Sequence, residues 1–464
     1  MFLPLYRLTK YHHQSRVACR GYELPPPSAD GGAHAAVSSV DIAAVRRQKQ
    51  QKRGGVSAEI EPPSWDYLEG IRYYFEVVRP GRVSDKGTGF NDPPFHSSTW
   101  NRTAFLGQIV CDQLSKASKA RGKLLRAGED PAFEPSWARY SRNMVDAIET
   151  VNQKIRDEAL YPNEAPAFMA IRHLLVLDLY LRRVLWRAHL RGTLAYIQHR
   201  GGIEEVLKLK QGPLYVNFAV ENIIHANTTS PAKQQLEGLE DFTDEQLKGS
   251  LSNACFAPCP LELYPLMVHI TRLRVSVADN RQLPRASLAL KVQDMFNTTW
   301  HFDPDEWAES DSWHGEVEVG RVYGRVFPIA IRLYGILTLP ASALIAWATS
   351  SAEIKLAHAT LTGHNIVESL RIQHREELLA LLRKNWGAVK YKPALVWPLL
   401  VAGVAVVDGA AEDRQFVEDC LDTILAMPIT ACSFITVVDK LRAFWRSGNT
   451  EWEDCWDEPT VGSA

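Results

Sequence analysis

Apolar residues recur at helical spacing along this chain from about residue 65 onward. The clearest row is formed by Tyr140, Met144, Ile148, Val151 and Ile155. Positions three and four residues apart lie on one face of a helix, so this row predicts an amphipathic helix with a buried face. No segment shows the sustained period-two alternation that is typical of strands. The pattern therefore predicts an all-α fold, a large multi-helix array or bundle.

Glycine, proline and capping residues indicate where the helices begin and end. Asn163 can cap a helix that has Pro166 in its first turn, and the apolar segment from Phe168 to Leu185 predicts a helix in the middle of a bundle. Gly201 and Gly202 predict the end of the following helix, since glycine adopts the left-handed conformation readily. Further helices are predicted over residues 322–348, 352–385, 393–408, 411–426 and 433–446.

Two polar stretches interrupt the helical pattern. Residues 226–250 predict an exposed connection because they are rich in Thr, Ser, Gln and Glu. Residues 299–320 contain Asp and Glu but neither Lys nor Arg, and they include Trp300, Trp307 and Trp313. This composition fits an acidic-aromatic interaction segment, or a surface loop anchored by tryptophans, which is the interpretation that we favour.

One apolar stretch, residues 326–348, has the length of a membrane span. Arg332 is its only charged residue, and Pro328 and Pro340 interrupt it. Prolines and a central arginine both make insertion into lipid costly. We therefore predict a core helix and no membrane span.

The first 60 residues have few large apolar side chains. They cannot bury enough surface to offset the entropy of ordering, so we predict a disordered segment over 1–60 and one helical domain over 61–458. Five cations lie within residues 46–53: Arg46, Arg47, Lys49, Lys52 and Arg53. Such a run can act as a nuclear-localisation signal or contact phosphates, or it can be a solvated run without function.

Composition and charge narrow the class of protein. The chain is 46% hydrophobic and 23% charged, and its 52 Lys and Arg against 54 Asp and Glu leave a formal charge of -2. There is thus no overall basic field that would draw the chain onto nucleic acid. Seven cysteines are too scattered for a disulfide framework in 464 residues, which favours a reducing compartment.

The sequence offers little enzymatic chemistry. We find no Gly-rich phosphate loop, no GxSxG and no HExxH. Cys255 and Cys259 lack a second pair of Cys or His at zinc-ligand spacing, and His189 is typical of a packed side chain on a helix face. We therefore expect no catalytic residue, no cofactor and no metal site, and a protein that is not an enzyme.

Several segments resemble, in the same order, the regulatory domain of fungal zinc-cluster transcription factors. The resemblance covers roughly residues 65–456 and is strongest in two patterns. The first is similar to W..HL.G....I..RGG, and the second is similar to WPL..AG.......DR. The residues that carry them are Trp186, His189, Gly192, Arg200, Gly201, Gly202, Trp397, Pro398, Gly403 and Arg414.

These residues are interpreted as structural. Tryptophans fill gaps between helices, glycines end helices, and Arg200 and Arg414 are expected to pair with carboxylates or helix ends. We expect them to hold the fold and to perform no chemistry.

The family usually carries six cysteines that bind two zinc ions ahead of this domain and set a helix into the DNA major groove. Here only Cys19 precedes Cys111, and one thiolate cannot hold two zinc ions. The resemblance therefore implies a regulatory domain without this DNA reader, from a divergent or truncated regulator or from a gene model that lacks its first exon.

The leading hypothesis is a nuclear transcription regulator that acts through protein contacts or an unidentified small effector. Its expected partners are a second copy of the chain or an intact zinc-cluster factor, and sequence-specific DNA binding by this chain alone is not expected. The alternatives are a helical enzyme of a specialised-metabolite pathway, with its pocket among the Trp- and His-bearing helices, and a scaffold partner of an intact zinc-cluster regulator.

Overall fold

The computed structural model describes part of the chain. These are residues 72, 76, 102–158, 166–181, 185–209, 212–240, 242–251, 259–279, 285–310, 313, 315–350, 363–427 and 430–461. The predictions made for residues 1–60, for Asn163 and for residues 352–362 lie outside them. Between Arg102 and Cys455 the described residues form seventeen α-helices, and they form no strand. This confirms the all-α prediction for the part of the chain that the structure describes.

The helices are joined by connections of different lengths. In chain order they are α3 (Arg102–Ala120), α4 (Glu134–Arg156), α5 (Pro166–Leu181), α6 (Trp186–His199), α7 (Ile203–Leu207), α8 (Gly212–Thr228), α9 (Asp244–Leu251), α10 (Tyr264–Ala278), α11 (Arg285–His301), α12 (Pro304–Glu309), α13 (Val317–Thr338), α14 (Ala341–Ser350), α16 (His364–Asn385), α17 (Val396–Ala405), α18 (Ala411–Ala426), α19 (Phe434–Ser447) and α20 (Trp452–Cys455). Short 3-10 turns lie at Pro131–Phe133, Ala232–Gln234, Leu261–Leu263 and Lys392–Leu395.

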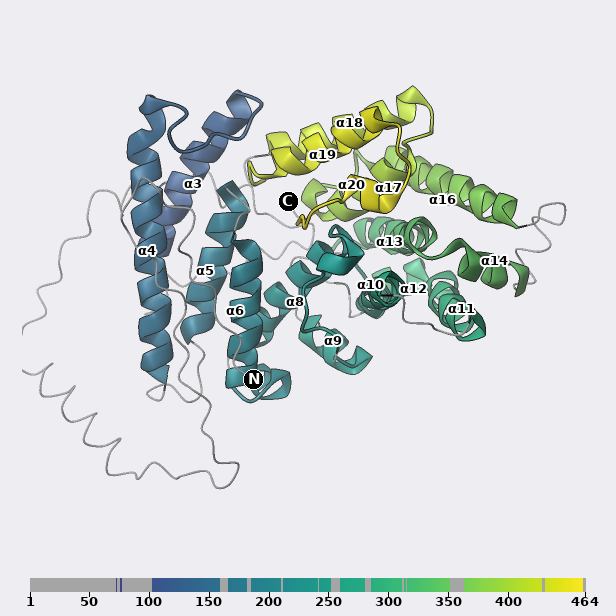
Figure 1. Ribbon diagram of the computed structural model, residues 1–464, viewed down its shortest axis with the longest axis horizontal. Coiled ribbons are helices and arrows are strands. Elements are labelled where there is room, and N and C mark those ends of the chain that lie inside the picture. The colour runs from purple at the N-terminus through teal and green to yellow at the C-terminus, as the bar shows by residue number, and fades with distance from the viewer. Residues whose placement is uncertain are drawn as a thin grey trace, which may run out of the picture.

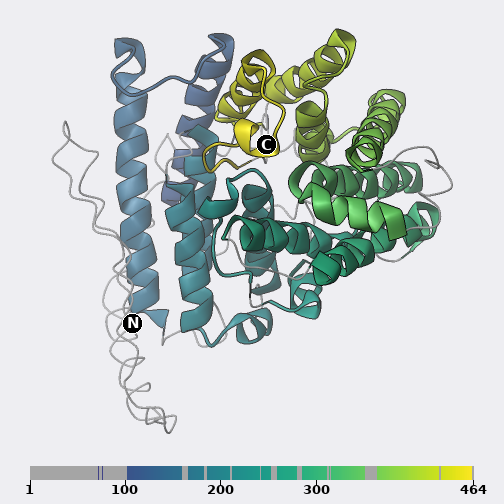
Figure 2. The same ribbon diagram turned by 45° about the vertical axis from the view of Figure 1, so that its right-hand side comes forward.

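The helices form two groups that meet at α8 (Figures 1 and 2). In one group α3, α4, α5 and α6 stand side by side, and α5 packs against α3, α4, α6 and α8. The other group holds α10 to α14 and α16 to α19, with α13 packed against α10, α11, α12, α16 and α17. The end of the described chain, at α20, lies between the two groups in both views.

Several predicted elements are confirmed. Tyr140, Met144, Val151 and Ile155 are buried on α4, and Ile148 packs against the core. The helix predicted over 411–426 is α18, and those predicted over 393–408 and 433–446 correspond to a turn followed by α17 and to α19. Helical periodicity therefore located most elements to within a few residues.

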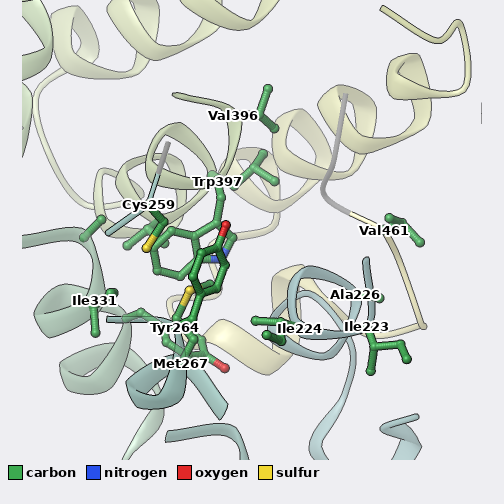
Figure 3. Packing of buried hydrophobic residues seen from close by; sticks show 14 of the residues in the cluster. Ile223, Ile224, Ala226, Cys259, Tyr264, Met267, Ile331, Val396, Trp397 and Val461 are labelled. Carbon is green, nitrogen blue, oxygen red and sulfur yellow. The ribbon is translucent and has the colours of Figure 1, made fainter. Parts of the chain in front are cut away.

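The core is one cluster of buried side chains contributed by both groups. Figure 3 shows the part where α8, α10, α13 and α17 meet, with Ile223, Ile224, Ala226, Tyr264, Met267, Ile331, Val396 and Trp397. Trp397 stacks on Phe327 of α13 with ring centroids 6.2 Å apart. Aromatic rings thus fill the space between helices at this crossing.

The apolar stretch over residues 326–348 is part of this core. The prediction of one helix over residues 322–348 is wrong, because the segment forms two helices: α13 runs through Pro328, and Pro340, which lacks a backbone N–H, separates it from α14. Arg332 is buried, and its Nη1 donates to the carbonyl oxygen of Thr299 over 3.1 Å. Among the described residues, no helix combines the length and the apolar character that crossing a bilayer requires.

The prediction of an exposed connection over residues 226–250 is wrong for its first part. α8 continues to Thr228, and Thr228, Thr229 and Ser230 are fully buried. Their hydroxyls and carbonyls find partners inside the protein, so polarity alone did not indicate exposure at this position. Residues 244–251 form α9, and Lys233, Glu237 and Glu240 are exposed.

The acidic segment over residues 299–320 has buried aromatic anchors. Trp307 and Trp313 are buried with ring centroids 5.3 Å apart, and Asp303 caps α12 by accepting from the backbone of Asp305 and Glu306. Arg321 of α13 pairs with Asp305, Glu309 and Glu318. These contacts support a surface segment anchored by tryptophans.

Candidate functional site

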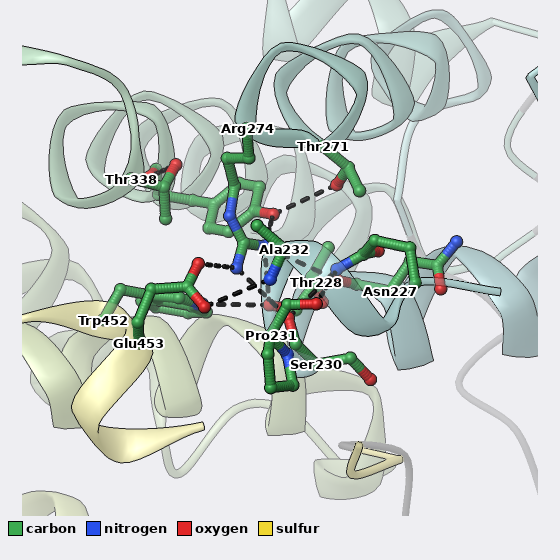
Figure 4. Close-up of polar contacts among 12 residues, drawn as sticks. Asn227, Thr228, Ser230, Pro231, Ala232, Thr271, Arg274, Thr338, Trp452 and Glu453 are labelled. Atoms are coloured by element: carbon green, nitrogen blue, oxygen red, sulfur yellow. Dashed lines mark hydrogen bonds and ion pairs between the residues drawn. The ribbon is translucent and has the colours of Figure 1, made fainter. Parts of the chain in front are cut away.

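A buried polar cluster lies where α8, α10, α13 and α20 meet. We call this cluster the polar junction and define it as Thr228, Thr229, Ser230, Arg274, Tyr334 and Glu453 (Figure 4). Its members are buried except for Glu453, whose side chain is half exposed at the edge of the cluster. At its centre Arg274 of α10 is 3% exposed. It lies between Glu453 on one side and the end of α8 on the other.

The end of α8 explains why an arginine lies here. The last carbonyls of a helix have no partner within the helix and carry partial negative charge. Arg274 Nη1 lies 3.3 Å from the carbonyl oxygen of Thr228, and Nη2 lies 3.1 Å from that of Ser230. The guanidinium of α10 therefore supplies hydrogen-bond donors to carbonyls at the end of α8.

Two side chains complete the surroundings of Arg274. Nη1 donates to the Tyr334 hydroxyl over 2.7 Å, and Nη2 donates to Glu453 Oε1 over 2.6 Å. Burial acts to lower the pKa of Arg274, but Tyr334 and Glu453 act in the opposite direction and the pKa is raised from its ordinary value. These contacts of Nη1 and Nη2 stabilise the charged form of the buried guanidinium.

Two tryptophans bind the same short segment. The Trp397 indole donates to Thr228 Oγ1 over 2.9 Å, and the Trp452 indole donates to the Thr228 carbonyl over 3.0 Å. The Tyr334 ring lies edge-on to Trp452, with centroids 5.0 Å apart. A fully buried threonine is thus the shared acceptor of α17 and α20.

The end of the described chain is fastened to the same segment. The backbone nitrogen of Thr460 donates to the Thr229 carbonyl over 3.2 Å, and Thr229 Oγ1 donates back to the Thr460 carbonyl over 2.7 Å. The backbone nitrogen of Ala232 donates to Glu453 Oε2 over 3.1 Å. The polar junction therefore joins parts of the chain that are more than two hundred residues apart.

A pocket of about 570 Å³ lies beside the polar junction. Its walls come from α8, α10 and residues 232–240, and it is lined by Ile224, Asn227, Ala232, Lys233, Gln235, Leu236, Glu237, Leu239, Glu240, Val268, Thr271, Arg272, Val275, Ser276 and Asp279. Asn227 holds one wall in place. Its Nδ2 donates to the Leu236 carbonyl over 3.0 Å, and its Oδ1 accepts from the Leu236 nitrogen over 2.7 Å.

The first pattern of sequence landmarks lies on α6, in the group of helices formed by α3 to α6. We call residues 186–202 the α6 joint. Trp186 and His189 are 3% exposed, and Gly192 is half-buried within the helix. Gly201 and Gly202 have φ angles of 95° and 97°, a conformation that other residues adopt with strain. The α6 joint is thus built from apolar packing and a glycine turn.

Arg200 ends α6 and pairs with Glu158, which follows α4. Tyr196 donates to the same carboxylate over 2.6 Å. Burial and the bond to Glu158 raise the pKa of Tyr196, so it remains a neutral phenol. The carboxylate connects α4 with α6.

The second pattern lies near the polar junction. Trp397 belongs to the cluster that surrounds Thr228, and Pro398 is buried beside it in α17. A Cβ atom on Gly403 would lie 2.5 Å from Leu441 Cδ2, so this glycine allows α19 to approach α17. Arg414 Nη1 donates to the Val407 carbonyl over 3.2 Å, just beyond the end of α17.

The buried titratable groups favour their neutral forms. Burial lowers the pKa of His189 and of His225 to about 4, and it raises the pKa of the Cys111 and Cys259 thiols. No cluster of three or more His, Cys, Asp and Glu side chains in the described part of the chain could hold a metal ion. His189, Cys111 and Cys259 are buried, as core residues are.

Sequence reasoning identified Trp397 as a landmark residue but did not identify the polar junction that it contacts. Arg272 and Arg274 are the two arginines of a helix with many apolar residues, and Thr228-Thr229-Ser230-Pro231 lies at the end of α8. These two signals could have indicated a buried arginine and a helix end. The basic run at 46–53 and Cys255 lie outside the described residues.

Comparison with known proteins adds two matches. Residues 138–460 match the family described as "Fungal specific transcription factor domain". Over 283 residues the chain is 24% identical to the "Phomenoic acid biosynthesis cluster-specific transcriptional regulator" of Leptosphaeria maculans (strain JN3 / isolate v23.1.3 / race Av1-4-5-6-7-8). The match covers 60% of this chain and 50% of that protein, so the chain spans about half the length of the curated relative. No solved structure matches the chain.

Proposed function

Because this chain belongs to the family of fungal specific transcription factor domains, we propose that it regulates transcription through its helical domain. The observation that carries the proposal is the family match over residues 138–460, which contains both landmark patterns and the whole polar junction. The similarity to a protein named as a cluster-specific transcriptional regulator supports the same class of activity.

The regulatory step in this proposal is binding, with no chemical reaction. Membership in a family of transcription factor domains suggests a protein that is not an enzyme, and the family match does not favour a helical enzyme. In the α6 joint, where an enzyme pocket was considered, Trp186 and His189 are packed in the core. The landmark residues therefore serve as joints between helices in this proposal.

The partners follow from the need to reach DNA. The chain has a net charge of -2, and we propose that sequence-specific contact with DNA comes from an intact zinc-cluster protein that binds the helical domain. A second copy of the chain is the other partner that we consider. We place its action in the nucleus, with Arg46, Arg47, Lys49, Lys52 and Arg53 as the localisation signal.

A tethering experiment tests the proposal. The full chain is fused to a heterologous DNA-binding module in a fungal cell that carries a reporter with the matching operator. We expect reporter transcription to change several-fold relative to the module alone. A fusion that is expressed and bound at the operator but leaves transcription unchanged would contradict the proposed function.

Two further measurements test the partner and the location. Purification of the tagged full chain should recover a zinc-cluster protein, whereas tight sequence-specific binding of DNA by the isolated chain would contradict the partner proposal. A fluorescent fusion should accumulate in the nucleus. Replacing the five cations at 46–53 by alanine should release it to the cytoplasm if this run is the signal.

A further inference from the structure

We propose that the pocket between α8, α10 and residues 232–240 binds a small amphipathic amine, a molecule with an apolar body and a cationic head. A regulatory role for this binding rests on the proposed function, but the binding itself can be measured independently. At about 570 Å³ the pocket has the size of ordinary small-molecule sites.

The inner wall suits an apolar body. Ile224 comes from α8, Leu236 and Leu239 from the connecting segment, and Val268 and Val275 from α10. All but Val275 are buried, and Val275 is half-buried nearer the opening. Apolar ligand surface placed against these side chains leaves water, which favours binding.

The rim suits a positive charge. Three carboxylates, those of Glu237, Glu240 and Asp279, line the pocket, against the cations Lys233 and Arg272. Arg272 donates to the carbonyls of Leu239 and Phe242, so its Nη2 already has backbone acceptors. The remaining rim is negative on balance, and a cationic head complements it better than an anionic one.

A buried acceptor in the lining points the same way. The Gln235 amide nitrogen donates to the carbonyls of Ser230 and Pro231, each over 3.0 Å, which fixes the orientation of the amide. Its Oε1 is buried and has no hydrogen-bond partner among the residues that the structure describes. A buried acceptor without a donor is costly, and an ammonium head in the pocket reaches this oxygen once the Gln235 side chain moves toward it.

The pocket shares two residues with the surroundings of the polar junction. Thr271 lines the pocket, and its Oγ1 lies 3.0 Å from the Tyr334 hydroxyl, which accepts from Arg274. Asn227 lines the pocket and clamps Leu236. A ligand that moves the Thr271 side chain therefore acts, through Tyr334, on Arg274 and its contact with Glu453 of α20.

The experiment uses the purified full chain and three probes that share one hydrocarbon body: 4-phenylbutylamine, 4-phenylbutanol and 4-phenylbutyrate. Ligand-observed NMR titration gives the affinity of each. We expect saturable binding in the order amine, alcohol, carboxylate. Equal binding of all three, preference for the carboxylate or absence of saturable amine binding would overturn the proposal.

Two pairs of variants locate the binding. Glu237→Gln with Glu240→Gln should weaken amine binding about threefold to tenfold, since each exposed charge pair contributes modestly. Glu376→Gln with Glu412→Gln removes the same charge from exposed positions elsewhere and should leave binding unchanged. Val275→Trp fills the pocket and should abolish binding, whereas Val277→Trp, on the same helix but not in the lining and 40% exposed, should not.

The reporter assay separates this proposal from the proposed function. A chain that regulates the reporter but does not bind the amine rejects the pocket proposal alone. A chain that binds the amine but never changes transcription rejects the proposed function alone. If the Glu237→Gln, Glu240→Gln variant and the Glu376→Gln, Glu412→Gln control weaken amine binding equally, the rim is not the binding site.

Discussion

The polar junction and the α6 joint both hold helices together, but they differ in what fills the space between the helices. At the α6 joint the space holds aromatic rings: Phe168 of α5 meets Tyr196 edge-on, with centroids 4.6 Å apart. At the polar junction the space holds a charged guanidinium and four of its acceptors. The α6 joint depends mainly on ring packing, with Tyr196 and Arg200 paired to Glu158, whereas the polar junction depends on hydrogen bonds from one buried guanidinium.

The largest expected effect comes from removing the guanidinium. Arg274→Met fills similar space but removes the charged donor from the carbonyls of Thr228 and Ser230 and from the Tyr334 hydroxyl. These acceptors keep only the weaker contacts with Trp452, Gln235 and Thr271. We expect the free energy of unfolding to fall by about 3–4 kcal/mol, because four hydrogen bonds to a charged group are lost, one of them to the half-exposed Glu453. Chemical denaturation measures it.

The matched control is Arg325→Met, because Arg325 pairs with Asp305 on the surface. Exposed pairs contribute about 0–1 kcal/mol, so this variant should be nearly as stable as the wild type. Equal losses in the two variants would remove the distinction between a buried junction and a surface ion pair.

Replacing one tryptophan beside the polar junction and one in the α6 joint by phenylalanine sharpens the comparison. Trp397→Phe loses ring volume and also leaves buried Thr228 without the indole donor, and we expect a loss of about 2–3 kcal/mol. None of the described residues accepts a hydrogen bond from the Trp186 indole, so Trp186→Phe loses volume alone, at about 1 kcal/mol. Similar losses at the two positions in thermal or chemical unfolding would contradict the distinction.

Lowering the pH should reduce the free energy of unfolding through one histidine in the α6 joint and one near the polar junction. Burial lowers the pKa of His189, in the α6 joint, and of His225, beside Trp397, to about 4 in the folded protein. The unfolded chain therefore takes up protons first, and stability that is complete above about pH 6.5 falls as the pH is lowered toward 4. We expect roughly 2 kcal/mol per histidine between pH 6.5 and 5.

Unfolding curves at several pH values measure this dependence. His189→Gln and His225→Gln should each flatten it, because each removes one group that protonates on unfolding. A pH dependence that neither variant changes would show that these imidazoles are not the groups responsible.

The smallest expected effect concerns backbone conformation. Gly202 has a φ of 97° and open space around its Cα, so Gly202→Ala should cost about 1–2 kcal/mol through backbone strain alone. Gly249 in α9 also has open space, but without a positive φ. Gly249→Ala should be neutral or stabilising by up to about 1 kcal/mol, and a loss equal to that of Gly202→Ala would rule out strain as the cause.

The α6 joint and the polar junction also differ in how far the sequence predicts them. Spacing and glycines placed the helices that carry Trp186 and Gly202, because helix faces and turns are local properties. The polar junction depends on Thr228, Arg274 and Glu453 meeting across more than two hundred residues, which no local pattern encodes. For this reason a polar stretch that predicted an exposed connection became the most buried polar segment of the domain.

The central claim is that the polar junction fastens α20 to the wall of the pocket. Hydrogen exchange of the full chain, followed in peptides that cover residues 229–240, tests it most directly. Glu453→Ala removes the acceptor of the Ala232 amide, and we expect that amide to exchange about fivefold to tenfold faster, while Glu451→Ala leaves it unchanged. Unchanged exchange over 229–240 in Glu453→Ala would contradict the claim.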